Sequence, residues 1–276
     1  MRLTIEQLEA KSQHIRLCIV EMIGYGKTGH LGGSCSVADI VTALYFYKMK
    51  YDPENPKWED RDRFILSKGH SALVQYAALA DLGYFPVEEL GRLKKLGSML
   101  QGHPDMLKTP GIEANTGSLG QGLSIACGIA AGLKLDRKEC KVYCVVGDGE
   151  IAEGQIWEAA LSAAFYKLDN LIVILDKNLI QATGSVVERF NTNPLPEKWK
   201  AFGWYTMEID GHDMKQIVET LDKADELKGK PIVIIANTIK GKGVAFAENT
   251  ALFHNGMMTQ EQYEVARAAL QAKETV

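Results

Sequence analysis

The chain has 276 residues, of which 46% are hydrophobic and 24% are charged, as is ordinary for a soluble globular protein. This length is near the upper size for one hydrophobic core, so we expect one domain that spans residues 1–276. The net charge of −4, with basic residues spread along the chain, gives no electrostatic reason to expect nucleic acid or a membrane surface as a partner.

The five cysteines are odd in number and include no C-x-x-C pair. Cys140 and Cys144 would lie about 13 Å apart along a strand, which is too far for a disulfide. This usage indicates buried thiols in a reducing compartment. The start of the chain has no long apolar stretch, and the apolar runs near Leu171 and Ile232 are shorter than a membrane span. We therefore expect a cytoplasmic protein.

The first segment, residues 4–24, shows helical periodicity, and Thr4 is placed to cap the helix. A glycine-rich loop, residues 24–33, follows and carries His30. The loop contains a G-x-G-x-x-G, but a dinucleotide fingerprint must follow a strand, whereas this one follows a helix. We therefore reject a dinucleotide-binding interpretation. The next helix is expected from about Val37 to Met49.

A short strand, Phe64–Leu66, ends in a loop that carries Lys68 and His70. Lysine as a point charge and histidine as a hydrogen-bond donor both suit a phosphate, and a helix N-terminus follows them. For this loop alone, a solvated turn is an equally good interpretation. After a helix-like stretch near residues 87–96, His103 lies between Gly and Pro, which hold it on a stiff turn.

A glycine-rich segment, Thr116–Gly122, leads into a helix of small residues, Ser124–Leu133. Glycine and alanine permit close backbone approach, either to a ligand or to a neighbouring helix. Tight packing between helix and sheet explains the same composition. Both interpretations stay open for this segment.

The most informative part of the sequence is a strand–helix–strand unit. One apolar run, Val142–Val146, ends in a Gly-Asp-Gly centred on Asp148, and a second, Leu171–Leu175, is followed by Asn178. Between them, apolar residues recur at helical spacing. In a parallel sheet, Asp148 and Asn178 then lie at the carboxyl ends of two strands, where open α/β sheets bind ligands. Their oxygens suit Mg²⁺ or Ca²⁺, although an ordinary βαβ unit with a glycine turn explains the Gly-Asp-Gly alone.

Further strands and helices complete the pattern. A strand ends near Asp210, and His212 is expected to orient the loop that follows it. Another buried strand, Pro231–Thr238, ends in a loop with Lys240, and residues 259–272 form a polar helix. The fold class is therefore α/β, with a mainly parallel sheet and helices on both faces.

These motifs resemble those of transketolases. Gly-Asp-Gly with Asn about thirty residues later is similar to the thiamine diphosphate motif, and Ser-Lys-Gly-His at 67–70 and Gly-His-Pro at 102–104 are similar to transketolase loops. The resemblance covers nearly the whole chain, in order. It implies a thiamine-diphosphate-binding fold of the diphosphate (PP) type.

The resemblance also implies site residues. Metal ligands are Asp148, Asn178 and the backbone carbonyl of Ile180. We infer that His30 and His103 polarise substrate oxygens, and that His70 and His254 serve both diphosphate and substrate. The cofactor-binding set implied is Lys68, His70, Gly117, Ser118, Leu119, Gly147, Asp148, Gly149, Glu153, Asn178, Ile180, Gln181, Lys240 and His254.

The family transfers a two-carbon ketol group from a ketose to an aldose, and its cofactor is activated by a glutamate on a second domain. This sequence contains no counterpart of that domain. We therefore expect the N-terminal subunit of a split transketolase, active only with a C-terminal pyrimidine-binding subunit in an α₂β₂ assembly, and acting on sugars or sugar phosphates. The alternatives are another enzyme of the same cofactor family, such as a deoxyxylulose-phosphate synthase half or a transketolase of unusual sugars, and a non-catalytic cofactor-binding scaffold.

Overall fold

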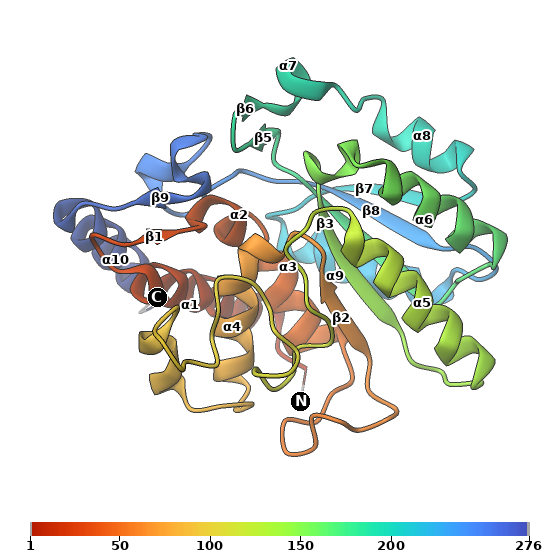
Figure 1. The fold of residues 1–276 in the computed structure, drawn as a ribbon, viewed down its shortest axis with the longest axis horizontal. Coiled ribbons are helices and arrows are strands. Elements are labelled where there is room, and N and C mark those ends of the chain that lie inside the picture. The colour runs from red at the N-terminus through yellow and green to blue at the C-terminus, as the bar shows by residue number, and fades with distance from the viewer. Residues whose placement is uncertain (1, 275–276) are drawn as a thin grey trace.

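The computed structural model describes residues 2–274, which build a five-stranded parallel sheet with helices on both faces (Figure 1). The strand order is β2-β3-β4-β8-β7, and every neighbouring pair is parallel. The strands are β2 (Arg63–Leu66), β3 (Val142–Gly147), β4 (Leu171–Lys177), β7 (Tyr205–Asp210) and β8 (Ile232–Asn237). The predicted fold class is confirmed.

Side chains of the central strands alternate between two hydrophobic cores. In β3, Tyr143 and Val145 belong to one core, whereas Val142, Cys144 and Val146 belong to the other. A strand covered on both faces needs apolar side chains at every position, which is why the run is continuous rather than alternating. All five cysteines are buried and free, as predicted.

Two sets of helices cover the two faces. The first face holds α1 (Ile5–Ile23), α2 (Leu31–Ser36), α3 (Ala38–Ala43), α4 (Ala72–Asp81), α9 (Met214–Glu226) and α10 (Gln260–Glu274). The second holds α5 (Gln121–Leu135), α6 (Gly154–Phe165) and α8 (Leu195–Ala201). Thr4 caps α1 through a reciprocal capping box with Gln7, as predicted for Thr4. No helix within residues 2–274 is both long and apolar enough to cross a bilayer.

Several helix boundaries differ from the prediction. The glycine-rich loop is shorter than expected, because α2 begins at Leu31, directly after His30. Gly33 is helical because its missing side chain lets α2 pack closely: an added Cβ would lie 2.7 Å from Ser71 Oγ. The helix expected at Val37–Met49 is α3 followed by a π-helical turn, Leu44–Lys48.

One further predicted stretch also differs. Residues near 87–96 form only a short 3₁₀ helix, Val87–Arg92, which ends before Lys94 adopts a left-handed φ of 59°. Residues 191–200, for which no element was predicted, contain the helix α8 with proline in its first turn, where proline is tolerated.

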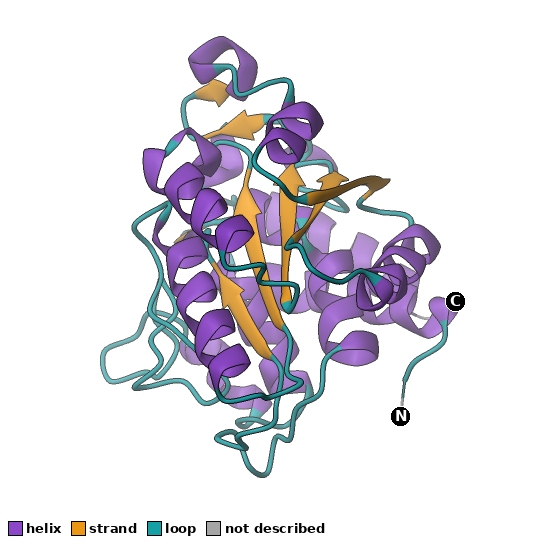
Figure 2. Cartoon of the chain, turned by 90° about the vertical axis from the view of Figure 1, so that its right-hand side faces the viewer, coloured by secondary structure: helices purple, strands orange, loops and turns teal. Residues whose placement is uncertain are grey.

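Two short β pairs bring distant loops to one edge of the sheet. Strand β1 (Thr28–Gly29) pairs with β9 (Gly256–Met257), so the loop of His30 lies beside the loop of His254. Strands β5 (Ile180–Gln181) and β6 (Gly184–Ser185) form a hairpin that leads into α7 (Val186–Phe190). Figure 2 shows this hairpin beyond the tips of the parallel strands. The carboxyl edge of the sheet is therefore where these loops gather.

Candidate active site

Asp148 directly follows β3, and its carboxylate accepts hydrogen bonds from two turns. One oxygen accepts the backbone N–H of Gly149 at 2.8 Å, and the other accepts the N–H of Leu179, which follows β4. Asp148 is 3% exposed. Burial, together with the neighbouring Asp176, raises its pKa to about 7. A bound cation would favour the ionised form of this carboxyl.

Asn178 and Ile180 lie in the turn between β4 and β5. Leu179 adopts a left-handed φ of 65°, which sharpens the turn, and Asn178 Oδ1 accepts the N–H of Ile180 at 3.1 Å. The carbonyl of Ile180 accepts a hydrogen bond from the ammonium of Lys240 at 2.8 Å. Since Asp148 binds the same turn at Leu179, the structure brings the three predicted metal ligands together.

A pocket is formed by the loops at this edge. It is lined by Gly33, Lys68, His70, Leu119, Gly147, Asp148, Gly149, Glu150, Asn178, Ile180, Gln181, Ala182, Lys240 and His254. Eleven of these residues are among those predicted from the sequence to bind cofactor, and Gly33, Glu150 and Ala182 are additional.

The residues of this pocket fit a diphosphate and a divalent cation. The carboxylate, amide and carbonyl oxygens of the predicted metal ligands are the donor types that Mg²⁺ and Ca²⁺ prefer. His254 also lines the pocket, and its Nδ1 is buried and has no hydrogen-bond partner among the described residues. A buried polar atom without a partner is costly, so a ligand oxygen or a water at this position would be stabilising. No group of three or more His, Cys, Asp or Glu side chains in residues 2–274 is arranged to hold a metal, so the mixed oxygen set is the candidate.

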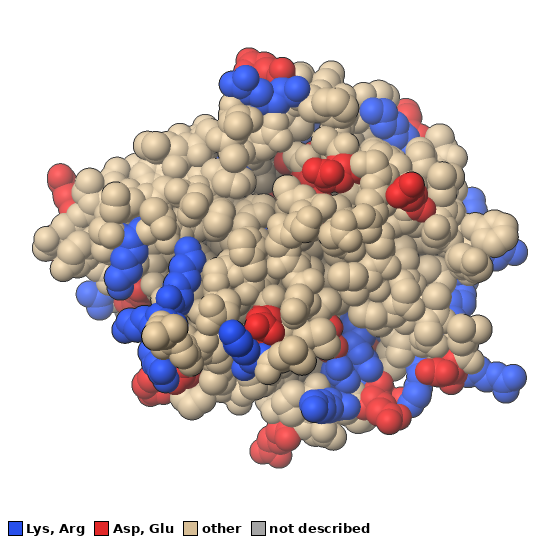
Figure 3. Space-filling view, viewed as in Figure 1, with Lys and Arg blue, Asp and Glu red and all other residues tan. Residues whose placement is uncertain are grey.

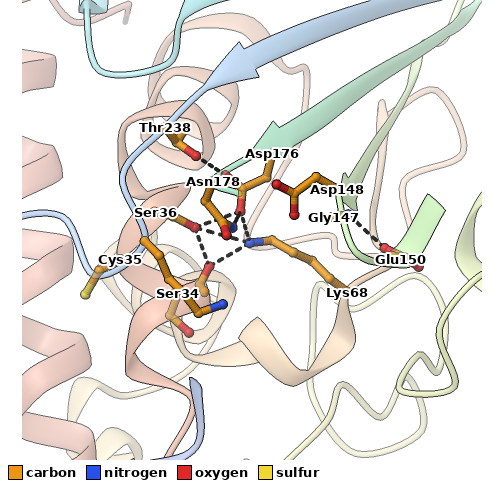
Figure 4. A network of polar contacts seen from close by, with 12 residues as sticks. Ser34, Cys35, Ser36, Lys68, Gly147, Asp148, Glu150, Asp176, Asn178 and Thr238 are labelled. Atoms are coloured by element: carbon orange, nitrogen blue, oxygen red, sulfur yellow. Dashed lines mark hydrogen bonds and ion pairs between the residues drawn. The ribbon is translucent and has the colours of Figure 1, made fainter. Parts of the chain in front are cut away.

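Asp176 is the centre of a buried polar cluster (Figure 4) that includes Lys68 and Asn178 from the pocket lining. One of its carboxylate oxygens accepts from Lys68 Nζ at 2.6 Å, Ser36 Oγ at 2.7 Å and Asn178 Nδ2 at 2.7 Å, and the other accepts from the hydroxyl of Thr238. Although burial opposes ionisation, Lys68 and these hydrogen bonds hold the pKa of Asp176 below its ordinary value. The cluster joins α2 to the ends of β2, β4 and β8, and through Asn178 it fixes the metal loop.

Lys68 is therefore engaged within the protein. Besides Asp176, its ammonium donates to the carbonyl of Gly33 at 2.7 Å and approaches Ser36 Oγ at 3.4 Å. Lys68 also lines the pocket. Its contact with a diphosphate stays a prediction.

Glu150, which also lines the pocket, connects three loops. Its carboxylate accepts the N–H of Gly120 and of Gly147, each at 2.9 Å, and the hydroxyl of Ser67. Burial raises its pKa despite these hydrogen bonds. Neither Glu150 nor Asp176 is among the predicted site residues. For Asp176 the available signal was its place directly after the apolar run Leu171–Leu175.

The four loop histidines converge beside the pocket. The ring centroid of His30 lies 5.1 Å from that of His70, 5.5 Å from that of His254 and 6.2 Å from that of His103. His70 and His254 are 4.9 Å apart. These residues come from four separate loops, so their predicted proximity is a property of the fold.

The surroundings of these rings disfavour the imidazolium form. Burial, followed by nearby Lys94, lowers the pKa of His30 to about 4. Burial, followed by Lys68, lowers the pKa of His70 to about 2, and burial with Lys240 lowers that of His254 to about 4. Burial and Lys94 also lower the pKa of His103. The cluster is neutral at pH 7, so each ring offers one N–H donor and one acceptor nitrogen.

Three predicted cofactor residues lie outside the pocket lining. Gly117 packs against the ring of His103, where an added Cβ would lie 3.0 Å from His103 Cδ2. Ser118 follows it in the same loop. Glu153 is exposed at the N-terminus of α6 and packs against Gly120. Their predicted roles stay predictions.

Comparison with known proteins places the chain in one family. The family described as "Transketolase, thiamine diphosphate binding domain" matches residues 8–275. The chain is 46% identical over 264 residues to the 6-deoxy-6-sulfo-D-fructose transketolase subunit SqwG of Clostridium sp. (strain MSTE9), covering 96% of both chains. It is 42% identical over 262 residues to an apulose-4-phosphate transketolase subunit of Phocaeicola vulgatus, covering 95% of this chain and 93% of that one.

Longer relatives match only in part. The chain is 36% identical to the transketolase of Pongo abelii, covering 94% of this chain and 41% of that protein. The solved structure of the Campylobacter jejuni transketolase superposes with a TM-score of 0.88 at 32% identity, covering 100% of this chain and 46% of that one. The chain belongs to the transketolase family, and over nearly its whole length it is similar to two proteins that are named as transketolase subunits.

Proposed function

We propose that residues 1–276 form one diphosphate-binding domain of a two-chain transketolase, which transfers a two-carbon ketol group from a ketose donor to an aldose acceptor. The observation that carries this proposal is the convergence of four neutral histidines beside a pocket that contains the three oxygen ligands of the metal loop. The first feature suits a substrate with several hydroxyl oxygens, and the second suits a metal-bound diphosphate.

The metal would be Mg²⁺ or Ca²⁺, held by Asp148, Asn178 and the carbonyl of Ile180. Lys240 is in direct contact with one of these ligands, because its ammonium donates to the carbonyl oxygen of Ile180 at 2.8 Å. Burial, followed by Lys68, lowers the pKa of Lys240 to about 8. An anion bound here would favour the charged form, so Lys240 is suited to contact a diphosphate.

Bound thiamine diphosphate supplies a nucleophilic carbon for the ketose carbonyl. The protein must hold the substrate oxygens and move protons as the carbonyl becomes a hydroxyl and then reverts. A neutral imidazole can donate and accept in the same orientation. We assign His30 and His103 to substrate oxygens, and His70 and His254, which line the pocket, to both the diphosphate and the substrate.

A complementary pyrimidine-binding subunit would complete the site, in an α₂β₂ assembly. Two relatives that match over nearly their whole length are named as transketolase subunits, which supports this arrangement. Helix α6 exposes Leu161 and Phe165, which are 59% and 78% accessible. Figure 3 shows few charged side chains at the centre of the face on which α5 and α6 lie. An apolar, weakly charged face suits a protein partner.

The donor would be a ketose with an anionic group at its far end. One relative is named for a sulfonated fructose and another for a sugar phosphate. Phosphate and sulfonate share the same recognition chemistry, namely charge-assisted hydrogen bonds to three oxygens. A screen of phosphorylated and sulfonated ketoses would identify the donor.

Reconstitution tests the proposal. The chain, mixed with its complementary subunit, thiamine diphosphate and Mg²⁺, should transfer a ketol group to an aldehyde acceptor, and neither chain should do so alone. Asp148→Ala should abolish cofactor binding and activity together, whereas Asp136→Ala, at the exposed end of α5, should change neither. Full activity of this chain alone would contradict the two-chain assignment. Retained activity in Asp148→Ala would contradict the site.

A further inference from the structure

A buried charge cluster lies behind the loop that carries Lys240. Arg16 in α1 is 1% exposed, and its guanidinium contacts both carboxylate oxygens of Asp39 in α3, at 2.9 and 2.5 Å. His212, in the loop after β7, completes the cluster, since its Nδ1 lies 2.7 Å from Asp39 Oδ2. None of these residues lines the cofactor pocket.

The hydrogen bonds of His212 define its tautomer. Its Nε2 is 2.8 Å from the backbone N of Ile239, and a backbone N–H can only donate. Nε2 is therefore the acceptor, and Nδ1 carries the proton that is donated to Asp39. His212 therefore links the buried carboxylate of Asp39 to the backbone of Ile239, the residue directly before Lys240.

Arg16 reaches the same loop from the other side. While its terminal nitrogens hold Asp39, its Nε donates to the carbonyl of Lys242 at 3.1 Å. The Lys240 loop, residues 239–243, is therefore held on both sides of Lys240, at the N–H of Ile239 and at the C=O of Lys242. Both attachments meet at Asp39.

Close backbone packing leaves the loop little room to shift. Gly241 has a φ of +79°, and an added Cβ would collide with the carbonyl oxygen of Ala247. Its N–H donates to the carbonyl of Gly32 in α2 at 3.0 Å. On the His212 side, a Cβ on Gly211 would lie 2.5 Å from Thr238 Cγ2. These contacts fix the backbone from which the Lys240 side chain extends.

We propose that Arg16, Asp39 and His212 position Lys240 for the cofactor diphosphate, with His212 as the positioning residue that binds Ile239, directly before Lys240. This inference rests on the proposed function of Lys240. Buried ion pairs contribute little to stability compared with apolar packing. This cluster instead makes two directional hydrogen bonds to the backbone on either side of Lys240, at Ile239 and at Lys242. Apolar packing could not supply such directional contacts.

A double-mutant cycle tests the inference. The variants are His212→Phe, Lys240→Met and the pair together, each assembled with the complementary subunit. The dissociation constant of thiamine diphosphate is measured by calorimetric titration at saturating Mg²⁺. His212→Phe should weaken binding about tenfold, as outer-shell partners of a binding site typically do. In the Lys240→Met background, His212→Phe should have no further effect, because there is no ammonium left to position.

Two further variants separate positioning from stability. In His212→Gln, the amide oxygen can accept from Ile239 and the amide N–H can donate to Asp39, so cofactor affinity should return to within about twofold of the wild type. The matched control is Trp204→Phe, which removes a buried hydrogen bond of 2.9 Å to the carbonyl of Ala160 on the other face of the sheet. It should lower the melting temperature without changing cofactor affinity.

The outcomes are distinct. Equal weakening by His212→Phe in both backgrounds, or weakening by Trp204→Phe of the same size, would overturn the positioning role, and so would unchanged binding in His212→Phe. If the wild type binds cofactor but Lys240→Met binds equally well, the role of Lys240 fails and the inference fails with it. If the wild type does not bind thiamine diphosphate, the proposed function itself fails.

Discussion

Two buried lysines stand at the same edge of the sheet in contrasting surroundings. Lys68 follows β2 and Lys240 follows β8, and each is only 2% exposed. Lys68 has a carboxylate, a carbonyl and a hydroxyl around its ammonium, whereas the ammonium of Lys240 has one hydrogen bond within residues 2–274, to the carbonyl of Ile180. The pKa of Lys240 is lowered, by burial and then by Lys68.

The comparison distinguishes a buried lysine that stabilises the fold from a buried lysine that is available to bind a ligand. A buried ammonium that is fully paired within the protein holds loops together, as Lys68 does with Asp176. An ammonium that is buried but incompletely paired is poised for an anion from outside. The following variants test this difference.

Removing Lys68 should have the largest effect, on folding. Lys68→Met leaves the carboxylate of Asp176 buried without its counter-ion, so the free energy of unfolding should fall by about 3–5 kcal/mol. Urea denaturation measures the loss. The double variant Lys68→Met with Asp176→Leu should recover much of it, because no unpaired charge is then left; failure to recover would show that Lys68 acts on more than this pair.

Removing Lys240 should instead affect binding. Lys240→Met should weaken thiamine diphosphate binding by about 10–100-fold, which is about 1.4–2.8 kcal/mol for a charge-assisted contact. The free energy of unfolding should stay the same or rise, since a poorly paired charge leaves the interior. Calorimetric titration and urea denaturation of one preparation measure both. A large loss of stability would place Lys240 in the same class as Lys68.

A smaller change among the residues around Lys68 should also lower stability rather than cofactor affinity. Ser36→Ala removes a hydroxyl that donates to Asp176 at 2.7 Å, and the loss of one hydrogen bond to a charged group is about 1.5 kcal/mol. The cost should appear in the denaturation midpoint. An effect on cofactor affinity with unchanged stability would contradict the structural role of this cluster.

The loop histidines resemble Lys240 in having no counter-ion among the described residues, and the pH dependence of stability should reveal this. The pKa of His30 is lowered to about 4, below the value of about 6.5 in an unfolded chain. Between these values the unfolded state binds a proton that the folded state does not, so stability falls as pH falls from about 6.5 to 4, and above 6.5 there is no contribution. His30→Gln should flatten this dependence by at most about 1.4 kcal/mol per pH unit. A slope identical to that of the wild type would contradict the low pKa.

Much of the site could be predicted from local sequence. Asp148 and Asn178 follow continuous apolar runs, and a parallel sheet necessarily brings such strand ends to one edge. The histidine loops were identified through glycine and proline neighbours and through their resemblance to a family, and the structure places the four rings within one cluster.

Long-range contacts could not be predicted in the same way. Asp176 is two residues from Asn178, but its partners Ser36, Lys68 and Thr238 come from three distant segments. The pairing of β1 with β9 rests on two residues in each strand, too few for a periodic pattern. The early start of α2 was missed because glycine disfavours helix locally, whereas close packing requires it there.

A crystal structure of the assembled enzyme with thiamine diphosphate and Mg²⁺ tests the central claim most directly. We predict that the metal binds Asp148, Asn178 and the carbonyl of Ile180, that the Lys240 ammonium leaves this carbonyl for the diphosphate, and that Lys68 stays on Asp176. Lys240 still bound to Ile180, or Lys68 released from Asp176 to bind the diphosphate, would contradict the distinction between the two lysines.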